Sequence, residues 1–482
     1  MEGTKARSPP LRNHLVMNAT EGRLKEYLDR RRREGTLRSL MRLPTAIDAK
    51  NDQELPNSIS STLIDFASND YLGFARCSHQ RALVQSAYDQ LFNPNIGIGM
   101  RSPMLGASGS RLLSGDSHLA RTLEVELADV HNRPAALLFN SGYDANLSVL
   151  SSLPYREDDA IVMDELVHNS LVMGVRMGRL KRERVYLFRH NDVVDLRRVL
   201  DHVASSSSSL SSTFVVVESV YSMDGDIAPL KSILELAKDM GAVVMVDEAH
   251  GLGVYGHTNA KNLEMISTDG DNSVIGNNAM DVQIKGGAGV LAALNLESHP
   301  ALLCSIHTFG KAAGCHGAIV AGSTTLIEYL VNYARPFVYS TALPQHSLVS
   351  IQQAYKSMMG GEGEIRRTKV FRLVCFFREG ISADLNADFP GSGFELLPSP
   401  SPIQAVVVPG NERCISVCQY LRNVGFDVYA IRSPTVAKGK ERIRIILHAH
   451  NSEDDVSGLM KMLVVALKRL SVPNPLKFIS KL

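Results

Sequence analysis

A short apolar run at residues 243–246 is followed directly by Asp247, Glu248, Ala249 and His250. Open α/β sheets place their ligands beyond the carboxyl ends of buried strands, where these polar groups would lie. A carboxylate held there and shielded from water would keep a pyridinium nitrogen protonated and strengthen that ring as an electron sink. An isolated carboxylate more often caps a turn, so this interpretation of Asp247 requires further groups.

Two other interpretations of the same stretch are excluded. A DEAH-type ATPase box needs a phosphate loop, and the chain contains no GxxxxGK[ST] sequence. Residues 251–256 match GxGxxG, but the acidic residues before them would place negative charge against a pyrophosphate. The ring-nitrogen interpretation remains.

A lysine and three further polar groups follow apolar runs in the same way. Lys311 stands among small residues that would let a planar ring approach it as a Schiff-base partner. Residues 140–146 open a predicted helix whose free amides would bind phosphate, and Gly142 would let the anion come close. His168 and Ser222 also lie just past predicted strands. The joint occurrence of these groups favours a cofactor site.

The elements that must position these groups alternate between short apolar runs and amphipathic stretches. The predicted strands are residues 135–139, 160–163, 214–217 and 242–246, with helices between them such as 119–130 and 230–240. This alternation predicts βαβ units and a mostly parallel sheet covered by helices on both faces. A second unit is expected after residue 343, with strands at 403–408 and 443–447. We therefore expect an N-terminal helical arm (1–60), a large domain (61–343) with an inserted surface excursion at about 257–300, and a smaller C-terminal domain (344–482).

The composition narrows the class of protein. The 482 residues include 51 Lys plus Arg and 50 Asp plus Glu, a net charge of +1 that argues against a nucleic-acid partner. Six scattered cysteines without a CxxC pair predict neither a disulfide framework nor a metal site. No apolar run approaches the roughly 18 residues that would span a membrane.

Of the two ends of the chain, only the C-terminal end carries a recognisable localisation signal. Residues 21–42 hold eight basic residues, but four acidic ones interrupt them, which favours a solvated helix over a mitochondrial presequence. The chain ends in Ser480, Lys481 and Leu482, a tripeptide that is read at a C-terminus as a peroxisomal address. We expect a peroxisomal protein, otherwise a cytoplasmic one.

These motifs in this order resemble the α-oxoamine synthases, a group of pyridoxal 5'-phosphate enzymes among the class II aminotransferases. The resemblance runs from about Leu24 to the end of the second unit, apart from the 257–300 stretch. It rests on matching segments at 68–73, 109–115, 140–146, 190–192, 221–226, 247–251, 308–311, 339–341, 434–436 and 442–444. It implies the fold type I architecture, a mostly parallel sheet with a smaller C-terminal α/β domain, and the decarboxylative condensation of an amino acid with an acyl-CoA.

The resemblance also implies roles for residues around the cofactor. Lys311 is similar to the Schiff-base lysine that also serves as the base, and Asp247 to the partner of the ring nitrogen. His250 and Ser222 resemble the groups near the ring's phenolic oxygen, and His168 the residue stacked on the ring. The expected phosphate-binding residues are Ser141, Gly142, Tyr143 and Thr308, with Ser340 and Thr341 supplied to the other subunit of a homodimer with shared active sites.

On the substrate side, Arg444 resembles the clamp for the amino-acid carboxylate, and a planar guanidinium suits that task. Asn69 and Arg38 match positions at the substrate and acyl-CoA end. The expected partners are therefore an amino acid, an acyl-CoA and a second copy of the chain, without nucleic acid or membrane.

Segments 68–73, 307–312 and 430–436 look most like one branch of the family, the 8-amino-7-oxononanoate synthases of biotin synthesis, in a fungal-type eukaryotic form. That branch joins L-alanine to a pimeloyl thioester. Glycine C-acetyltransferase, 5-aminolevulinate synthase or a secondary-metabolism relative remain alternatives. A non-catalytic subunit of the family is a further hypothesis, which Lys311 and Asp247 disfavour because such subunits lose the lysine.

Overall fold

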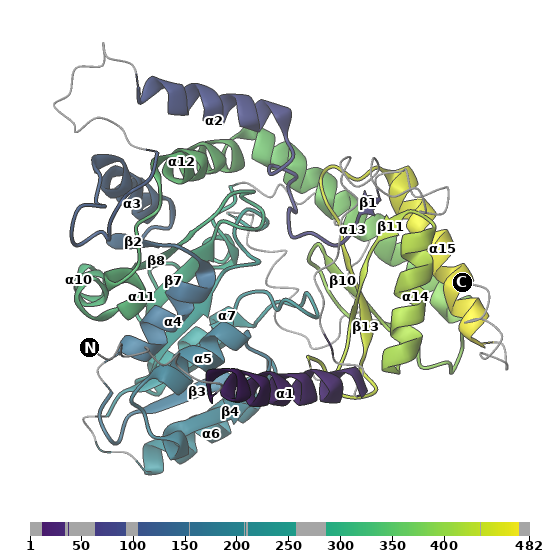
Figure 1. The fold of residues 1–482 in the computed structure, drawn as a ribbon, viewed down its shortest axis with the longest axis horizontal. Coiled ribbons are helices and arrows are strands. Elements are labelled where there is room, and N and C mark those ends of the chain that lie inside the picture. Colours follow the sequence, from purple (N-terminus) through teal and green to yellow (C-terminus); the bar gives the residue numbers. More distant parts are fainter. Residues whose placement is uncertain are drawn as a thin grey trace, which may run out of the picture.

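The computed structural model describes residues 12–33, 37, 63–92, 105–153, 155–206, 208, 211–256, 286–433 and 435–471. A larger body carries one long sheet, and a C-terminal body of sheet and helices lies beside it (Figure 1).

The central sheet has seven strands in the order β2-β8-β7-β6-β5-β3-β4. Only β8 runs antiparallel to its neighbours in this sheet, so the other six strands point the same way. The strands are β2 (Ala135–Phe139), β3 (Ala160–Asp164), β4 (Val185–Phe188), β5 (Thr213–Glu218), β6 (Val243–Asp247), β7 (Leu302–Thr308) and β8 (Ala318–Gly322). The predicted mostly parallel sheet is confirmed.

Nearly all side chains of β3, β6 and β8 are buried, as expected for strands that helices cover. The helices that pack most closely on the strands of this sheet are α3 (His118–Val130), α4 (Gly142–Ser152), α6 (Val193–Ser205), α7 (Leu230–Asp239) and α10 (Thr324–Tyr333). The remaining helices here are α2 (Ser78–Gln90), α5 (Asn169–Met177), the 3₁₀ turn η2 (Arg182–Arg184), α9 (Val290–Ala293), α11 (Arg335–Val338) and α12 (Gln345–Met359).

The C-terminal body holds a four-stranded antiparallel sheet in the order β12-β13-β10-β9. Its strands are β9 (Glu395–Leu396), β10 (Ile403–Val407), β12 (Tyr429–Ile431) and β13 (Arg442–Ile446). Its helices are α13 (Gly361–Asp388), α14 (Asn411–Asn423) and α15 (Glu453–Ser471), seen at the right of Figure 1. Strands at 403 and 443 were predicted, and both are present.

Two segments cross between these bodies. Strand β1 (Ile64–Asp65), at the start of the predicted large domain, pairs in parallel with β11 (Phe426–Asp427) of the C-terminal body. Helix α12 of the larger body, just past the predicted boundary at residue 343, contacts α2 and α3 on one side and α13 of the C-terminal body on the other. The chain is therefore attached to the C-terminal body at β1, and the residues that follow β1 lead from there into the larger body.

The prediction of a surface excursion over 257–300 is wrong for its second part. Residues 257–285 lie outside the described residues, but Val290, Leu291 and Ala293 are buried in the core. The physical reason is the buried Glu248 carboxylate, which accepts the backbone N–H groups of Val290 at 3.1 Å and Leu291 at 2.7 Å. An apolar stretch with its first amides satisfied in this way can enter the core.

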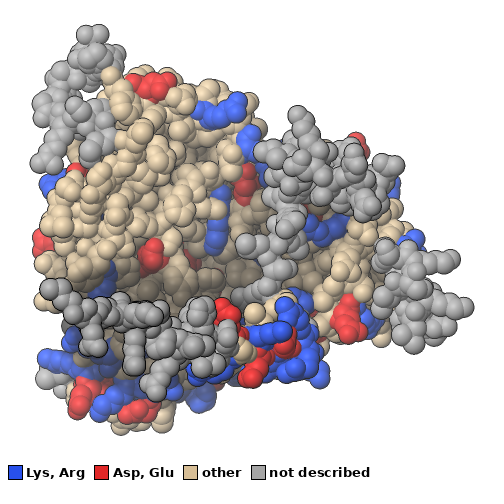
Figure 2. All heavy atoms as spheres, viewed as in Figure 1, with Lys and Arg blue, Asp and Glu red and all other residues tan. Residues whose placement is uncertain are grey.

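Helix α1 (Arg12–Arg33) lies within the predicted N-terminal arm, and its described side chains from residue 20 onward are exposed apart from the half-buried Asp29. Figure 2 shows basic and acidic side chains gathered along this lower part of the molecule, whereas much of the larger body on this face is uncharged. Among the described residues, no helix is both long and apolar enough to cross a membrane.

Candidate active site

The predicted site residues follow the carboxyl ends of parallel strands. Residues 140–143 follow β2, His168 follows β3, Ser222 follows β5, His250 follows β6 and Lys311 follows β7. Because these strands run in the same direction, their carboxyl ends lie at one edge of the sheet. The register places Glu218 directly beside Asp247 at the ends of β5 and β6.

Lys311 and His250 are in direct contact, with Nζ and Nε2 2.7 Å apart. The other ring nitrogen of His250 lies 2.5 Å from the Tyr71 hydroxyl. Burial lowers the pKa of Lys311 from 10.5 to about 8, although the Asp247 and Glu218 carboxylates oppose the shift. Burial and the Lys311 ammonium together hold the pKa of His250 well below its usual range, so this imidazole is neutral. We call Lys311, His250, Asp247 and His168 the lysine cluster.

Asp247 is buried, and each of its oxygens accepts a hydrogen bond. Asn146 on α4 donates its amide to Oδ2 at 2.7 Å, and the backbone N–H of Ala249 donates to Oδ1 at 2.8 Å. The Asn146 amide also donates to Ser170 at 2.9 Å. These partners fix the orientation of the carboxylate without a basic side chain among the donors, which keeps its negative charge for another cation.

His168 is the N-cap of α5, and its ring and its backbone are each held by one hydrogen bond. Its Nδ1 lies 2.7 Å from the Ser170 hydroxyl, and its backbone N–H donates to Glu218 at 2.5 Å. Burial within the larger body lowers the pKa of His168 despite the attraction of Asp247, so the ring stays neutral. A neutral ring held in this way can lie flat on an aromatic partner.

The N-terminus of α4 faces Thr308 at the end of β7. Ser141 caps the helix by accepting the Asp144 N–H at 3.1 Å, and its own hydroxyl donates to the Asp144 carboxylate. A Cβ at position 142 would lie 3.1 Å from Thr308 Oγ1, so a glycine allows this close approach. The half-exposed Tyr143 is the next residue of the helix. First-turn amides and a nearby hydroxyl form an anion-binding end.

Arg444 lies where three segments meet. Its Nε donates to the Ser222 carbonyl at 2.7 Å, and its Nη2 donates to Asn69 Oδ1 at 3.0 Å. Tyr71, which contacts His250, also donates to Asn69 Oδ1 at 3.3 Å. We call Arg444, Asn69 and Ser222 the arginine junction. A continuous set of polar contacts, Lys311–His250–Tyr71–Asn69–Arg444, joins it to the lysine cluster.

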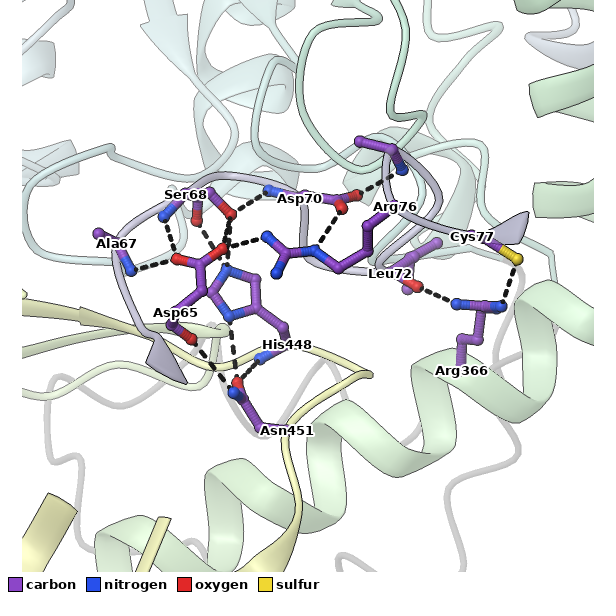
Figure 3. Close-up of polar contacts among 11 residues, drawn as sticks. Asp65, Ala67, Ser68, Asp70, Leu72, Arg76, Cys77, Arg366, His448 and Asn451 are labelled. Carbon is purple, nitrogen blue, oxygen red and sulfur yellow. Dashed lines mark hydrogen bonds and ion pairs between the residues drawn. The ribbon is translucent and has the colours of Figure 1, made fainter. Parts of the chain in front are cut away.

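The segment that carries Asn69 is held to the C-terminal body by the network drawn in Figure 3. Asp65 accepts the N–H groups of Ala67 and Ser68, both at 2.9 Å, and pairs with Arg76. The buried His448 ring lies 2.8 Å from the Ser68 carbonyl and 3.1 Å from Asn451. Asn451 in turn donates to the Asp65 carbonyl at 3.1 Å.

Two predicted residues, Ser340 and Thr341, are not joined to these groups by the contacts described so far. Thr341 accepts the Asn140 side-chain amide on its carbonyl at 3.0 Å. Ser340 lines the same small cavity of about 20 Å³ as Asn140 and Thr341. Arg38 lies outside the described residues, so its place at the site stays a prediction.

Three residues at the site were missed by the sequence analysis. Tyr71 and Asn146 both stand inside recognised motifs, where only their neighbours were singled out. Glu218 ends an apolar strand, which is the same signal that identified Asp247. Burial and the neighbouring Asp247 raise the pKa of Glu218 well above its usual range, which favours the protonated form of this side chain beside Asp247.

This set of groups fits pyridoxal 5'-phosphate. Lys311 would hold the aldehyde carbon, Asp247 the ring nitrogen and His168 one ring face, and His250 and Ser222 would serve the ring oxygen. The α4 end, with Gly142 making room beside Thr308, supplies donors for a phosphate.

Comparisons with known proteins agree with that chemistry. Residues 61–463 match the family model described as aminotransferase class I and II. The chain is 36% identical over 424 residues to the 8-amino-7-oxononanoate synthase of Emericella nidulans, covering 86% of this chain and 91% of that protein. It is also 36% identical over 411 residues to the enzyme of that name from Saccharophagus degradans, covering 85% and 88%.

Solved structures show the same architecture. Serine palmitoyltransferase from S. paucimobilis, solved with bound cofactor, superposes with a TM-score of 0.68 at 25% identity over 85% of this chain and 88% of that one. The 8-amino-7-oxononanoate synthase of Francisella tularensis superposes with a TM-score of 0.62 at 22% identity over 85% and 99%. The seven-stranded sheet with its C-terminal antiparallel sheet is therefore the fold of the pyridoxal-phosphate-dependent transferases.

Proposed function

Because the chain belongs to the class I and II aminotransferase family, and within it to the α-oxoamine synthase group, we propose that it joins L-alanine to pimeloyl-CoA. The products would be 8-amino-7-oxononanoate, CoA and carbon dioxide, in the synthesis of biotin. The identity of about 36% to two 8-amino-7-oxononanoate synthases over most of the chain supports this choice of substrates.

The observation that carries the proposal is the set of polar contacts from Lys311 to Arg444. With Lys311 as the base and Arg444 as the carboxylate clamp, the two ends of this network would hold an amino acid between them with its α-carbon facing Lys311. A bidentate guanidinium–carboxylate pair fixes that orientation.

Each residue then has a task at a stated atom. Bound pyridoxal phosphate supplies an electron sink for the bond that breaks at the α-carbon. Lys311 Nζ takes the α-proton, and its pKa of about 8 leaves more neutral amine near pH 7 than an ordinary lysine has. His250, neutral and held by Tyr71, keeps Nζ in place when the lysine is free. Asp247 would pair with the protonated ring nitrogen of the bound cofactor and so favour its electron-accepting form.

The test is an assay of CoA release by the purified holoenzyme with each pair of amino acid and acyl-CoA. We expect L-alanine with pimeloyl-CoA to give the largest kcat/KM. Serine with palmitoyl-CoA belongs in the same assay, because a serine palmitoyltransferase superposes with the higher of the two TM-scores quoted above. Turnover of another pair without turnover of alanine and pimeloyl-CoA would overturn the substrate proposal.

We also propose a homodimer in which Ser340 and Thr341 of one copy complete the phosphate site of the other. Leu113 and Tyr339 support this surface: they are 83% and 82% exposed, on segments joined by the Ala342 N–H to Gly109 carbonyl bond at 2.9 Å. Mixing Lys311→Ala chains with chains carrying Ser340→Ala and Thr341→Ala should restore activity beyond the sum of the two preparations. No gain in mixed dimers would contradict shared sites.

Peroxisomal import remains a proposal that rests on the final tripeptide, which lies outside the described residues. A fluorescent protein fused to the N-terminus should enter peroxisomes in cells, and deletion of Leu482 should leave the fusion in the cytosol. Equal distributions of the two fusions would remove the peroxisomal assignment.

A further inference from the structure

His190, in the turn after β4, lies between two carboxylates from different strand ends. Its Nδ1 is 2.9 Å from Asp164 at the end of β3, and its Nε2 is 2.7 Å from Asp226 in the turn after β5. A carboxylate accepts only, so both ring nitrogens donate and the ring is an imidazolium. Burial alone would lower the pKa of His190, but these two hydrogen bonds outweigh it and raise the pKa to about 10.

Asp226 belongs to a loop of residues 219–227 that closes on itself. Val220 and Ile227 form an antiparallel bridge, and Tyr221 donates its N–H to the Asp226 carbonyl at 3.0 Å. The His190 ring also meets the Tyr221 ring edge to face, with centroids 4.4 Å apart. The imidazolium thus fixes this loop to the end of the central sheet.

The far side of the loop contacts the C-terminal body. Ser399 donates its hydroxyl to the Gly225 carbonyl at 2.9 Å, and Arg442 pairs with Asp224. Gly225 has φ of +79°, and a Cβ there would lie 2.3 Å from the Ile403 carbonyl oxygen, so the loop fits against β10 without spare room. Arg444 donates to the Ser222 carbonyl in the same loop.

We propose that His190 is a positioning residue that sets the direction of the Arg444 guanidinium through this loop. Without the imidazolium, Asp164 and Asp226 would face each other as like charges, and the loop carrying the Ser222 carbonyl would shift. A displacement of about 1 Å at a substrate clamp is enough to cost roughly 100-fold in activity.

His190, Asp224 and Asp226 are also close enough to form a metal site. That use is excluded because both His190 nitrogens donate to carboxylates and Asp224 already has Arg442 as its cation. The cluster therefore acts through charge and hydrogen bonding within the chain.

The proposal rests on Arg444 as the carboxylate clamp but not on which amino acid the enzyme uses. The test compares two ligands in the holoenzyme, followed by the change in the cofactor's visible absorption: L-alanine, and ethylamine, which has the same carbon–nitrogen unit without the carboxylate. In His190→Gln we expect roughly 10- to 100-fold weaker binding of L-alanine with ethylamine binding unchanged within about twofold. His202→Gln, at an exposed histidine of α6, is the matched control and should change neither.

Asp226→Asn removes the carboxylate that His190 contacts in the loop, and it should also weaken the binding of L-alanine but not of ethylamine. This second variant tests the proposal even if His190→Gln does not fold. If a folded variant bound both ligands equally more weakly, or bound both as tightly as the wild type, the positioning role would be overturned. If wild-type enzyme gave no spectral change with any amino acid, the proposed function would fail instead, so the two failures are distinguishable.

Discussion

The lysine cluster and the arginine junction have complementary roles in the proposed reaction but are built differently. Asp247 ends strand β6, and His250 and Lys311 follow the adjacent strands β6 and β7, so the hydrogen-bond ladder of one sheet sets their spacing. Arg444, Asn69 and Ser222 come from β13, the segment after β1 and the loop after β5, which are far apart along the chain. The cluster is therefore rigid by virtue of local backbone pairing, whereas the junction depends on how two bodies pack together.

This difference gives the two regions different weak points. Damage to the lysine cluster should remove chemistry and leave the fold and substrate affinity, because its residues are supported by the sheet. Damage to the junction should weaken amino-acid binding and, where the supporting network is cut, stability. The following experiments order these effects from the largest to the smallest.

Lys311→Ala should lower turnover by roughly a thousandfold or more, since in the proposed reaction the same amine holds the cofactor and moves the α-proton. CoA release measures the turnover, and circular dichroism checks that the fold is retained. Lys356→Ala, at an exposed lysine of α12, is the control. Retention of more than about a tenth of wild-type activity would mean that another base serves the reaction.

Asp247→Asn keeps the shape of the side chain but removes its charge, and should lower kcat by roughly 100- to 1,000-fold. The buried carboxylate has no basic side chain among its hydrogen-bond donors to take over its role. Steady-state kinetics should show little change in the amino-acid KM. Asp239→Asn, at the exposed end of α7, should be neutral. A rise in KM without a fall in kcat would place Asp247 in substrate binding instead.

Arg444→Lys keeps the positive charge but loses the forked guanidinium, so the amino-acid KM should rise roughly 10- to 100-fold with a smaller change in kcat. The control is Arg372→Lys, an exposed arginine of α13 paired with Glu453. A fall in kcat as large as the rise in KM would contradict the functional distinction between the junction and the lysine cluster.

Asn451→Ala tests the network under the junction. It removes the acceptor of the His448 N–H at 2.9 Å and the donor to the Asp65 carbonyl, so we expect unfolding to become easier by about 1–3 kcal/mol. The amino-acid KM should rise a few-fold while cofactor affinity stays the same. Thermal unfolding and kinetics together measure this, with Asn423→Ala at an exposed site as reference. Weaker cofactor binding would show that the two regions are not separately supported.

The pKa of Lys311 gives a pH test on cofactor-free protein. Because burial lowers this pKa to about 8, the amine is protonated below pH 8 and neutral above it. Roughly a tenth is neutral at pH 7, about 300 times the fraction for an amine of pKa 10.5. Acylation at Lys311, followed by mass spectrometry, should reach half its maximal rate near pH 8, with exposed Lys356 as an internal reference. A midpoint near pH 10 would contradict the burial argument.

The sequence analysis succeeded best where signals are local. The apolar strands, the polar groups that end them and the order of motifs all come from neighbouring residues, and the mostly parallel sheet follows from them. It failed over 286–300, where a buried Glu248 draws an apolar stretch into the core across more than forty residues. It also passed over Tyr71 and Glu218, whose value lies in contacts with His250 and His168 that no spacing rule predicts.

The sequence by itself determined which groups are offered for chemistry: a lysine, a carboxylate and histidines at strand ends and, through the family resemblance, an arginine fit to hold a carboxylate. Side-chain types and their positions just after apolar runs are local properties, so they can be read along the chain. Only the tertiary structure decided the orientation of the Arg444 guanidinium, because its partners Asn69 and Ser222 lie 375 and 222 residues away in the chain. Such contacts depend on the packing of two bodies and on supports such as His190, which are set by the balance of buried charge and hydrogen bonding across the whole fold.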